Sequence, residues 1–390
     1  MEHEFSDNLK RFQTGIFAAL NEKKEALQKE GKEVFNFSVG TPDFEPPKHV
    51  MRALSEAAMK PENYRYALRD LPELIEAVQK FYQKRFGVTL KETEVMSLYG
   101  SQEGMAHLSL ALCNPQDIVL VPNPGYPIFS IGPIIAQCQL STYPLYRENN
   151  FLPDLKKIPC EVALKAKYMV VSYPSNPVCT VANDTFYEEL IEFATKYNIM
   201  ILHDNAYSDI VCGDGYGKSF LSYEGAKEVG IEFYSLSKSY NMTGARISFA
   251  VGNEEMIEKF KQLRSQIDFG IFLPIQYAAI AALTGPRDNV IEQKKQYEIR
   301  NHALCSGLRS IGWEVQESQG TMFVWAPLPK GYTNSEDFTM KLAEKSGVLV
   351  VPGSSFGSLG EGFVRFALVH NEETIQRAID SIAKSGVLNI

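Results

Sequence analysis

Short, unbroken apolar segments that alternate with helical segments are the feature that most restricts how this chain can fold. Apolar runs at Ile118–Pro122, Tyr168–Tyr173 and Ile199–His203 have the length of strands, and they lack the polar alternation of a strand with one face in water. A helical pattern at Thr185–Lys196 lies between two of these runs. Buried strands separated by helices predict a mostly parallel sheet that helices cover on both faces.

The C-terminal part of the chain has a different pattern. A long helical stretch is expected through residues 274–311, and shorter strands and helices follow it. The later segments are expected at Met322–Ala326, Glu336–Lys345, Phe363–Val369 and Glu373–Ala383. We therefore predict an α/β fold with a large domain at residues 45–285 and a smaller α+β domain built from residues 1–44 and 286–390.

Polar residues follow several of the predicted strands directly. Asn176 follows one strand, Asp204 follows another, and Ser235–Lys238 follows a third. Ligands of parallel sheets bind at the carboxyl ends of the strands. We therefore expect these side chains to meet at one edge of the large sheet and to form the functional site.

Lys238 and its neighbours have the chemistry of a covalent cofactor site. Burial disfavours the charge of a lysine between two apolar strands, which makes Lys238 a candidate nucleophilic amine for Schiff-base formation. The hydroxyl groups of Ser235 and Ser237 and the cation of Arg246 could hold a phosphate. A glycine turn at Gly100 opens a helix whose N–H groups could also receive an anion. A lysine beside a phosphate site suggests pyridoxal 5'-phosphate (PLP).

Composition and charge narrow the classes of partner. The formal net charge of −8 disfavours nucleic acid and anionic membrane surfaces as main partners. The six cysteines are scattered, without C-x-x-C pairs or histidines at metal-ligand spacing, so we expect no metal site. No signal peptide and no apolar stretch of about 18 residues is recognised, and a cytoplasmic location is expected.

Several motifs, in order along the chain, resemble those of the PLP-dependent fold-type I aminotransferases of class I/II, the aspartate aminotransferase-like fold. They are Val39-Gly-Thr-Pro-Asp43, Tyr173-Pro-Ser-Asn-Pro177, His203-Asp-Asn-Ala-Tyr207, Ser235-Leu-Ser-Lys238 with Arg246, and Phe363-Val-Arg-Phe366. The stretches that begin at Gly100, Asn123 and His203 are similar to those of LL-diaminopimelate and alanine aminotransferases. The resemblance implies amino-group transfer between an amino acid and a 2-oxo acid by a ping-pong mechanism, with aspartate as a further possible donor.

The resemblance also implies roles for residues around the cofactor ring. Lys238 matches the Schiff-base lysine, and Asp204 matches the carboxylate that keeps the pyridine nitrogen protonated. Tyr207 and Asn176 match the side chains that share the ring oxygen. Tyr126 matches the aromatic side chain that stacks on the ring.

Further roles concern the phosphate, the substrate and a second subunit. Ser235, Arg246 and the backbone N–H groups of Ser101 and Gln102 match the phosphate ligands. Arg365 matches the arginine that grips the substrate carboxylate, and an arginine in an apolar strand needs an anionic partner in any case. Gly40 and Asn176 match substrate-contacting positions. Tyr66 matches a tyrosine that reaches the phosphate of the neighbouring subunit, which implies a homodimer with shared active sites.

The chain also departs from the family pattern in places. The segment Ala67–Leu71, after Tyr66, has no glycine, and Gln102 stands where LL-diaminopimelate enzymes often have a lysine. A PLP-dependent carbon–sulfur β-lyase remains an alternative because the cofactor motifs do not separate it from a transaminase. A non-catalytic PLP-binding sensor domain is a remote alternative, since Lys238 and Asp204 are both present.

Overall fold

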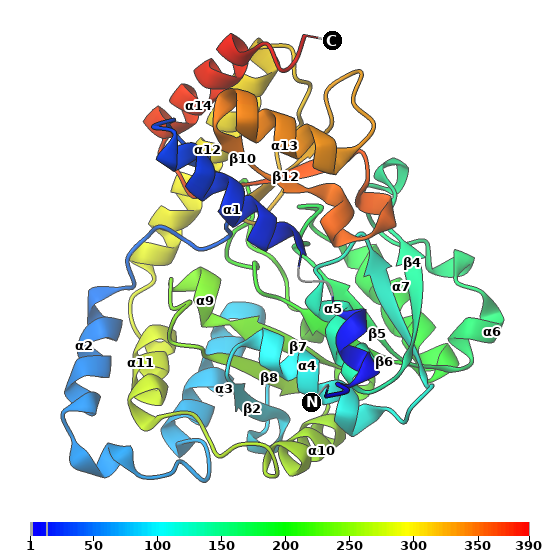
Figure 1. The fold of residues 1–390 in the computed structure, drawn as a ribbon. Helices are drawn as coiled ribbons and strands as arrows, with labels where there is room; N and C mark the ends of the chain where they lie inside the picture. Colours follow the sequence, from blue (N-terminus) through cyan, green and yellow to red (C-terminus); the bar gives the residue numbers. More distant parts are fainter. Residues whose placement is uncertain (1–2, 13–14, 390) are drawn as a thin grey trace.

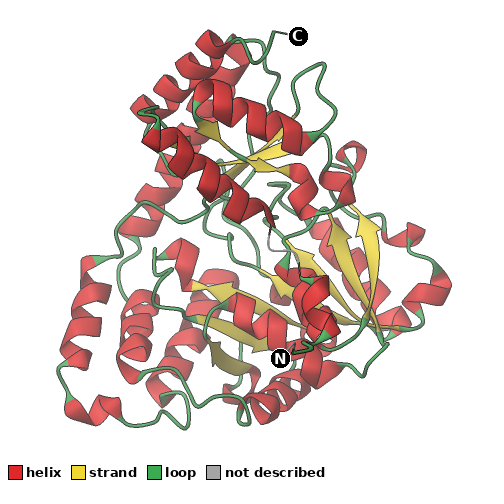
Figure 2. Ribbon diagram, in the orientation of Figure 1, coloured by secondary structure: helices red, strands yellow, loops and turns green. Residues whose placement is uncertain are grey.

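The computed structural model describes residues 3–12 and 15–389 and contains one large and two small sheets (Figures 1 and 2). Four of the six strand pairings in the seven-stranded sheet are parallel, and β8 is antiparallel to both of its neighbours. In spatial order the strands are β2 (Val95–Leu98), β8 (Ser248–Gly252), β7 (Gly230–Ser235), β6 (Met200–Asp204), β5 (Ala166–Ser172), β3 (Ile118–Asn123) and β4 (Gln139–Pro144). The prediction of a mostly parallel sheet is confirmed.

Helices cover both faces of this sheet. Val119 and Val121 of β3 pack in one buried cluster with Leu108 of α4 (Ser101–Leu112), whereas Leu120 packs in the cluster on the opposite face with Leu190 of α7 (Asp184–Tyr197). Successive side chains of a strand point to opposite faces, so a strand that is buried on both faces must be apolar throughout. This is the physical reason for the unbroken apolar runs in the sequence.

The remaining helices of this part of the chain surround the sheet (Figure 1). They are α2 (Lys48–Ala58), α3 (Pro72–Phe86), α5 (Ile128–Ile135), α6 (Cys160–Ala163), α8 (Ala226–Val229), α9 (Leu236–Ser239), α10 (Glu254–Arg264) and α11 (Leu273–Thr284). Within the described residues, no helix combines the length and the apolar character needed to cross a bilayer.

A smaller α+β region lies above the large sheet in Figure 2. An antiparallel sheet is built from β11 (Val351–Pro352), β12 (Phe363–Ala367) and β9 (Phe323–Pro327), and β1 (Phe35–Asn36) pairs in parallel with β10 (Val348–Leu349). Its helices are α1 (Gly15–Lys29), α13 (Ser335–Ser346) and α14 (Glu372–Ser385). The pairing of β1 with β10 brings the N-terminal segment into this region. The domain boundaries at residues 45 and 285 stay a prediction.

The expected single helical stretch through residues 274–311 is two helices. It breaks between α11, which ends at Thr284, and α12 (Asp288–Ser310). Gly285 has an extended backbone, and Pro286 has no N–H group to continue the helical hydrogen bonds. Two adjacent helix-breaking residues were therefore the signal for this boundary.

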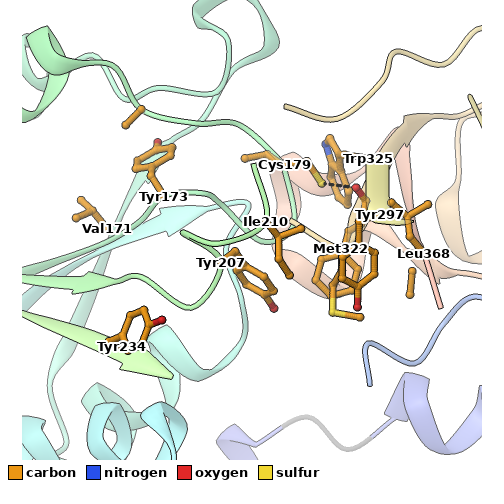
Figure 3. Packing of buried hydrophobic residues seen from close by; sticks show 14 of the residues in the cluster. Val171, Tyr173, Cys179, Tyr207, Ile210, Tyr234, Tyr297, Met322, Trp325 and Leu368 are labelled. Carbon is orange, nitrogen blue, oxygen red and sulfur yellow. Dashed lines mark hydrogen bonds between the residues drawn. The ribbon is translucent and has the colours of Figure 1, made fainter. Parts of the chain in front are cut away.

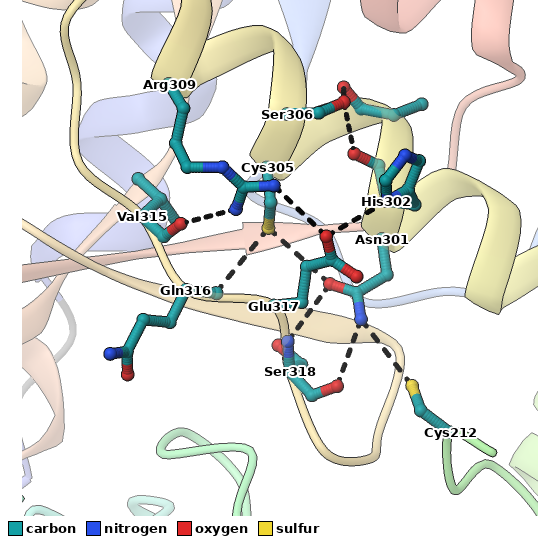
Figure 4. Close-up of polar contacts among 11 residues, drawn as sticks. Cys212, Asn301, His302, Cys305, Ser306, Arg309, Val315, Gln316, Glu317 and Ser318 are labelled. Atoms are coloured by element: carbon teal, nitrogen blue, oxygen red, sulfur yellow. Dashed lines mark hydrogen bonds and ion pairs between the residues drawn. The ribbon is translucent and has the colours of Figure 1, made fainter.

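Helix α12 connects the two regions through polar contacts (Figure 4). Asn301 donates from Nδ2 to the carbonyl oxygen of Ser318 at 3.0 Å and to Sγ of Cys212 at 3.5 Å, and its Oδ1 accepts from the N–H of Ser318 at 3.1 Å. One amide side chain thereby joins a loop next to the large sheet with the segment that leads into β9.

Candidate active site

A cavity of about 390 Å³ lies at the carboxyl ends of β6 and β7, between the large sheet and the smaller region. Eleven of the predicted site residues line it: Gly40, Ser101, Gln102, Tyr126, Asn176, Asp204, Tyr207, Ser235, Lys238, Arg246 and Arg365. The cavity sits where the parallel-sheet rule places a ligand. The predicted residues therefore come together in space although they span most of the chain.

Lys238 lies on α9, directly after β7, and its amine enters the cavity. Nζ donates a hydrogen bond of 2.6 Å to the carbonyl oxygen of Gly40. Burial lowers the pKa of Lys238 to about 8, and the positive charges of Arg365 and Arg246 act in the same direction. At this pKa about a tenth of the amine is unprotonated at pH 7, far more than for an ordinary lysine, and the unprotonated amine is the nucleophilic form.

Asp204 ends strand β6 and is only 8% exposed. Its Oδ1 is buried and has no hydrogen-bond partner among the described residues. Burial raises the pKa of Asp204 to about 6. A buried carboxylate oxygen without a donor is costly, so this position fits a ligand that supplies an N–H group, such as a protonated pyridine nitrogen.

Tyr207 lies three residues further on, packed between the large sheet and the smaller region. Figure 3 shows it between Val171 and Tyr234 on one side and Met322 on the other, all within one buried cluster. Burial raises the pKa of Tyr207, so its phenol stays protonated and can donate a hydrogen bond. The ring also contacts Phe323 edge-on, with centroids 5.9 Å apart.

The end of the cavity at the start of α4 has the features of an anion site. Helix α4 begins at Ser101, and the buried Oγ of Ser101 has no hydrogen-bond partner among the described residues. Arg246 Nη1 donates to the carbonyl oxygen of Thr243 at 2.9 Å, and its guanidinium lies against Gly100. Ser235 Oγ accepts from the N–H of Ser237 at 3.1 Å. Helix N–H groups, hydroxyls and a guanidinium together suit a phosphate.

Arg365 on β12 is a second cationic centre, 4% exposed. Nη1 donates to Oδ1 of Asn176 at 2.7 Å, and its buried Nε has no hydrogen-bond partner in the described part of the chain. The guanidinium carbon lies 4.1 Å from the ring centroid of Phe323. A buried guanidinium that is held by an amide and an aromatic ring keeps its capacity for an anionic ligand such as a carboxylate.

The loop that carries Gly40 is held close to these groups. A side chain on Gly40 would place its Cβ 2.7 Å from the Phe323 ring, so only glycine fits without movement. Asp43 forms a two-pronged ion pair with Arg300 of α12, at 2.7 and 2.8 Å. Arg300 Nη1 also donates to the carbonyl oxygen of Leu368 at 2.9 Å, just beyond the strand that carries Arg365.

Tyr66 lies outside the cavity lining and is 77% exposed. Its ring packs on Phe269 with centroids 4.7 Å apart. The carbonyl oxygen of Ala67 accepts from the N–H of Gly270 at 2.7 Å, which joins the two exposed loops. A role at a phosphate for Tyr66 therefore needs a second copy of the chain and stays a prediction.

Several residues that line the cavity were not predicted from the sequence as site residues. They are Ser38, Val39, Thr41, Met105, Ile128, Thr243 and Phe323. Val39 and Thr41 flank Gly40 in the quoted motif, so their position in sequence was a usable signal. Phe323 reaches the site through the pairing of β9 with β12, and no local pattern indicates this.

Comparisons with known proteins identify the family to which the chain belongs. The family model described as aminotransferase class I and II matches residues 32–382. An LL-diaminopimelate aminotransferase of Halothermothrix orenii is 43% identical over 387 residues, which cover 98% of this chain and 99% of the relative. The enzyme of the same name from Moorella thermoacetica is 43% identical over 372 residues and covers 95% of both chains.

Solved structures are similar over the same length. Substrate-bound BacF from Bacillus subtilis superimposes with a TM-score of 0.94 at 38% identity and covers 98% of both chains. A probable N-succinyldiaminopimelate aminotransferase from Thermus thermophilus has a TM-score of 0.90 at 34% identity, covering 95% of this chain and 99% of that one. The predicted fold-type I architecture and aminotransferase activity are confirmed. The chain belongs to the aminotransferase class I and II family, whose members depend on PLP.

Proposed function

We propose that the cavity binds PLP and that the chain transfers an amino group from an amino acid to a 2-oxo acid in two half-reactions. The observation that carries this proposal is the presence, in one cavity, of the Lys238 amine with its lowered pKa and of the buried Oδ1 of Asp204, which has no partner among the residues that the structure describes. When bound, PLP supplies an electron-withdrawing ring that stabilises negative charge at the substrate Cα. The residues of the chain bind, orient and move protons around that ring.

Around the ring, we assign Lys238 as the nucleophile and as the base that moves the Cα proton. Asp204 accepts the ring N–H, and the buried environment strengthens this contact. Tyr207 donates its phenol hydrogen to the ring oxygen. Since Asn176 Oδ1 is engaged by Arg365, its Nδ2–H group is the donor that it offers to the same ring oxygen. Tyr126 stacks on the ring face.

The phosphate and the substrate carboxylate take the two anion sites. The N–H groups of Ser101 and Gln102, Oγ of Ser235 and the guanidinium of Arg246 hold the phosphate. Arg365 grips the α-carboxylate of the amino acid, and the loop at Gly40 closes the same end of the cavity. Binding at both ends fixes the substrate Cα within reach of Lys238.

A homodimer in the cytoplasm completes the proposal. The exposed loops around Tyr66 and Phe269 present a cluster of apolar side chains, which is typical of a protein interface. Through this interface Tyr66 reaches the phosphate site of the second copy. All six cysteines are unpaired thiols, which supports a reducing compartment.

Half-reaction spectroscopy on the PLP form tests the function. Single amino acids are added without an acceptor, and the visible band of the lysine-bound cofactor is followed. The panel includes alanine, aspartate, glutamate and LL-diaminopimelate. The last of these is included because a similar protein is named LL-diaminopimelate aminotransferase. Conversion to pyridoxamine phosphate, restored by a 2-oxo acid, is the expected result. Full turnover by Lys238→Ala would contradict the proposal, and pyruvate and ammonia released without an acceptor would indicate a β-lyase.

A further inference from the structure

We propose that Gln293 of α12 is a positioning residue for Lys238, and that Asn241 extends its hold to the loop that carries Gly40. The inference rests on the proposed function and concerns how the chain keeps the reactive amine in place. Gln293 and Asn241 do not line the cavity, so both act through the residues that they hold.

The backbone of Lys238 needs an outside partner because α9 is only 4 residues long. The last carbonyl groups of a helix have no donor within the helix. Gln293 supplies one, since its Nε2 donates to the carbonyl oxygen of Lys238 at 2.7 Å. Gln293 is 3% exposed, so water competes little for this bond. The bond therefore fixes the backbone from which the amine extends.

A second amide carries this hold to the loop of Gly40. Asn241 donates from Nδ2 to Oε1 of Gln293 at 2.8 Å and to the carbonyl oxygen of Glu45 at 3.3 Å. Asn241 has φ +56°, a left-handed conformation that asparagine adopts more readily than most other residues with a side chain. The same loop accepts the Lys238 amine through the carbonyl oxygen of Gly40, so both ends of the lysine are tied to it.

One face of α12 holds both the lysine and this loop. Gln293, Tyr297 and Arg300 are spaced four and three residues apart, which places them on the same side of the helix. The Tyr297 ring packs edge-on against Phe44, with centroids 5.3 Å apart, and Arg300 pairs with Asp43. A displacement of this face would therefore move the loop and the backbone that bears the amine relative to the sheet.

This arrangement bears on proton transfer at the substrate Cα. The transfer requires Nζ of Lys238 within hydrogen-bond reach of the proton, and a small misplacement of a catalytic group costs a large factor in rate. Without the Gln293 amide, the end of α9 has one restraint fewer, and the amine spends less time in the productive position. The α-carboxylate site is formed by Arg365 on β12, so the binding of the amino acid should change little.

Gln293→Met tests the inference, because methionine has a similar length and cannot donate a hydrogen bond. In the PLP-loaded protein, with the amino acid that reacts fastest, we expect the maximal rate of the half-reaction to fall about tenfold, while KM changes by less than about twofold. The primary isotope effect with the Cα-deuterated amino acid should increase, because proton transfer becomes slower relative to the other steps.

Gln79→Met is the matched control. Gln79 on α3 also donates from Nε2 to a backbone carbonyl oxygen, that of Leu90 at 2.8 Å, and both residues lie outside the cavity lining. This variant loses the same kind of bond and should keep the rate, KM and the isotope effect. An equal fall in rate in both variants would show that the loss of any such bond slows the enzyme, and Gln293 would then have no special role.

Hydrogen exchange followed by mass spectrometry, with and without PLP, gives a readout that does not depend on activity. In Gln293→Met, the backbone N–H groups of residues 236–245 and 40–45 should exchange at least about threefold faster, with no change in β3. Asn241→Gly permits the left-handed backbone and deletes the amide, so it should speed exchange in residues 40–45. Equally faster exchange throughout Gln293→Met would indicate general destabilisation and would overturn the inference.

The outcomes separate the inference from the function on which it rests. If Gln293→Met leaves the rate, the isotope effect and the exchange unchanged, the inference is wrong while the transaminase assignment stands. If the unaltered chain converts no amino acid, the proposed function fails. Hydrogen exchange then decides by itself whether Gln293 restrains the backbone of Lys238.

Discussion

At the scale of single residues, the amine of Lys238 shows how burial changes the chemistry of a side chain. An ordinary lysine with a pKa near 10.4 is almost entirely protonated at pH 8. Burial, with the charges of Arg365 and Arg246, lowers the pKa of Lys238 to about 8. The neutral amine is therefore available without a separate base, which links the position of the lysine directly to its proposed role.

We predict that capture of PLP by the cofactor-free chain follows this lowered pKa. The capture rate should rise with pH, reach half of its maximum near the pKa of about 8 and level off between about pH 9 and 10, because nearly all of the Lys238 amine is then neutral. Stopped-flow absorbance measures the rate, and free Nα-acetyl-lysine under the same conditions corrects for the titration of the cofactor. A rate that still rises steeply beyond about pH 10 would show that the pKa of the amine is that of an ordinary lysine.

Asp204 illustrates a conflict between function and stability. Its carboxyl has a folded-state pKa of about 6 against an ordinary value of 3.8, so the folded state favours the protonated form. The ionised carboxylate therefore destabilises the cofactor-free fold by up to about 3 kcal/mol above pH 6, and the destabilisation disappears as the pH falls towards 4.

Asp204→Asn should stabilise the cofactor-free chain at pH 7.5 by part of that amount. Urea unfolding at pH 7.5 and at pH 4 measures the free energy of unfolding of the variant and of the unaltered chain. The difference between the two should vanish at pH 4. Turnover of the loaded enzyme should fall by about 10²- to 10³-fold, since a buried charge partner is lost. Destabilisation at both pH values would mean that the carboxylate has a structural partner that the amide cannot replace.

At the scale of elements, the start of α4 depends on the backbone conformation of Gly100. This residue has φ +91°, and a Cβ there would meet the guanidinium of Arg246. Gly100→Ala should therefore move Arg246 and weaken PLP binding by about tenfold or more. Gly312→Ala is the matched control, because Gly312 has φ +87° in open space. It should cost stability and leave the dissociation constant of PLP unchanged in a spectral titration.

The loop that carries Gly40 depends on one ion pair with α12. Asp43→Asn removes the charge that holds Arg300 at 2.7 Å, and Arg300 also holds the end of β12. We expect KM for the amino acid to rise about fivefold to tenfold while PLP affinity stays constant, because neither residue lines the cavity. Glu76→Gln removes the exposed pair with Lys80 and should change neither quantity. An equal loss of PLP affinity in Asp43→Asn would indicate general destabilisation.

At the scale of the whole molecule, the exposed loops around Tyr66 and Phe269 are the proposed contact between two copies. Phe269 is 56% exposed and packs on Tyr66, so Phe269→Asp should introduce a charge into the contact. Light scattering after gel filtration should show a shift from dimer to monomer, with a loss of specific activity on dilution. Leu164→Asp alters an apolar residue that is 67% exposed on a different surface, and it should leave the dimer intact. A monomeric unaltered chain would overturn the assembly proposed here.

Several features of the site were predictable because their signals are local. Asp204 ends one buried strand and Lys238 lies in the short helix after another, and the rule for parallel sheets brings such residues to one edge. The helix start at Ser101 was recognisable from the preceding glycine. By contrast, Phe323 and the ion pair between Asp43 and Arg300 join segments far apart in the sequence, and no periodicity records such a pairing.

The sequence by itself determined the class of fold and the chemical types of the site residues, because strand burial and side-chain chemistry are written in local pattern. Only the tertiary structure decided which groups lack partners and how far burial shifts their pKa values. It left Oδ1 of Asp204 and Nε of Arg365 unpartnered in the described chain, and it placed the Lys238 amine against the carbonyl oxygen of Gly40. These properties depend on desolvation and on distances between remote segments, which exist only once the chain has packed.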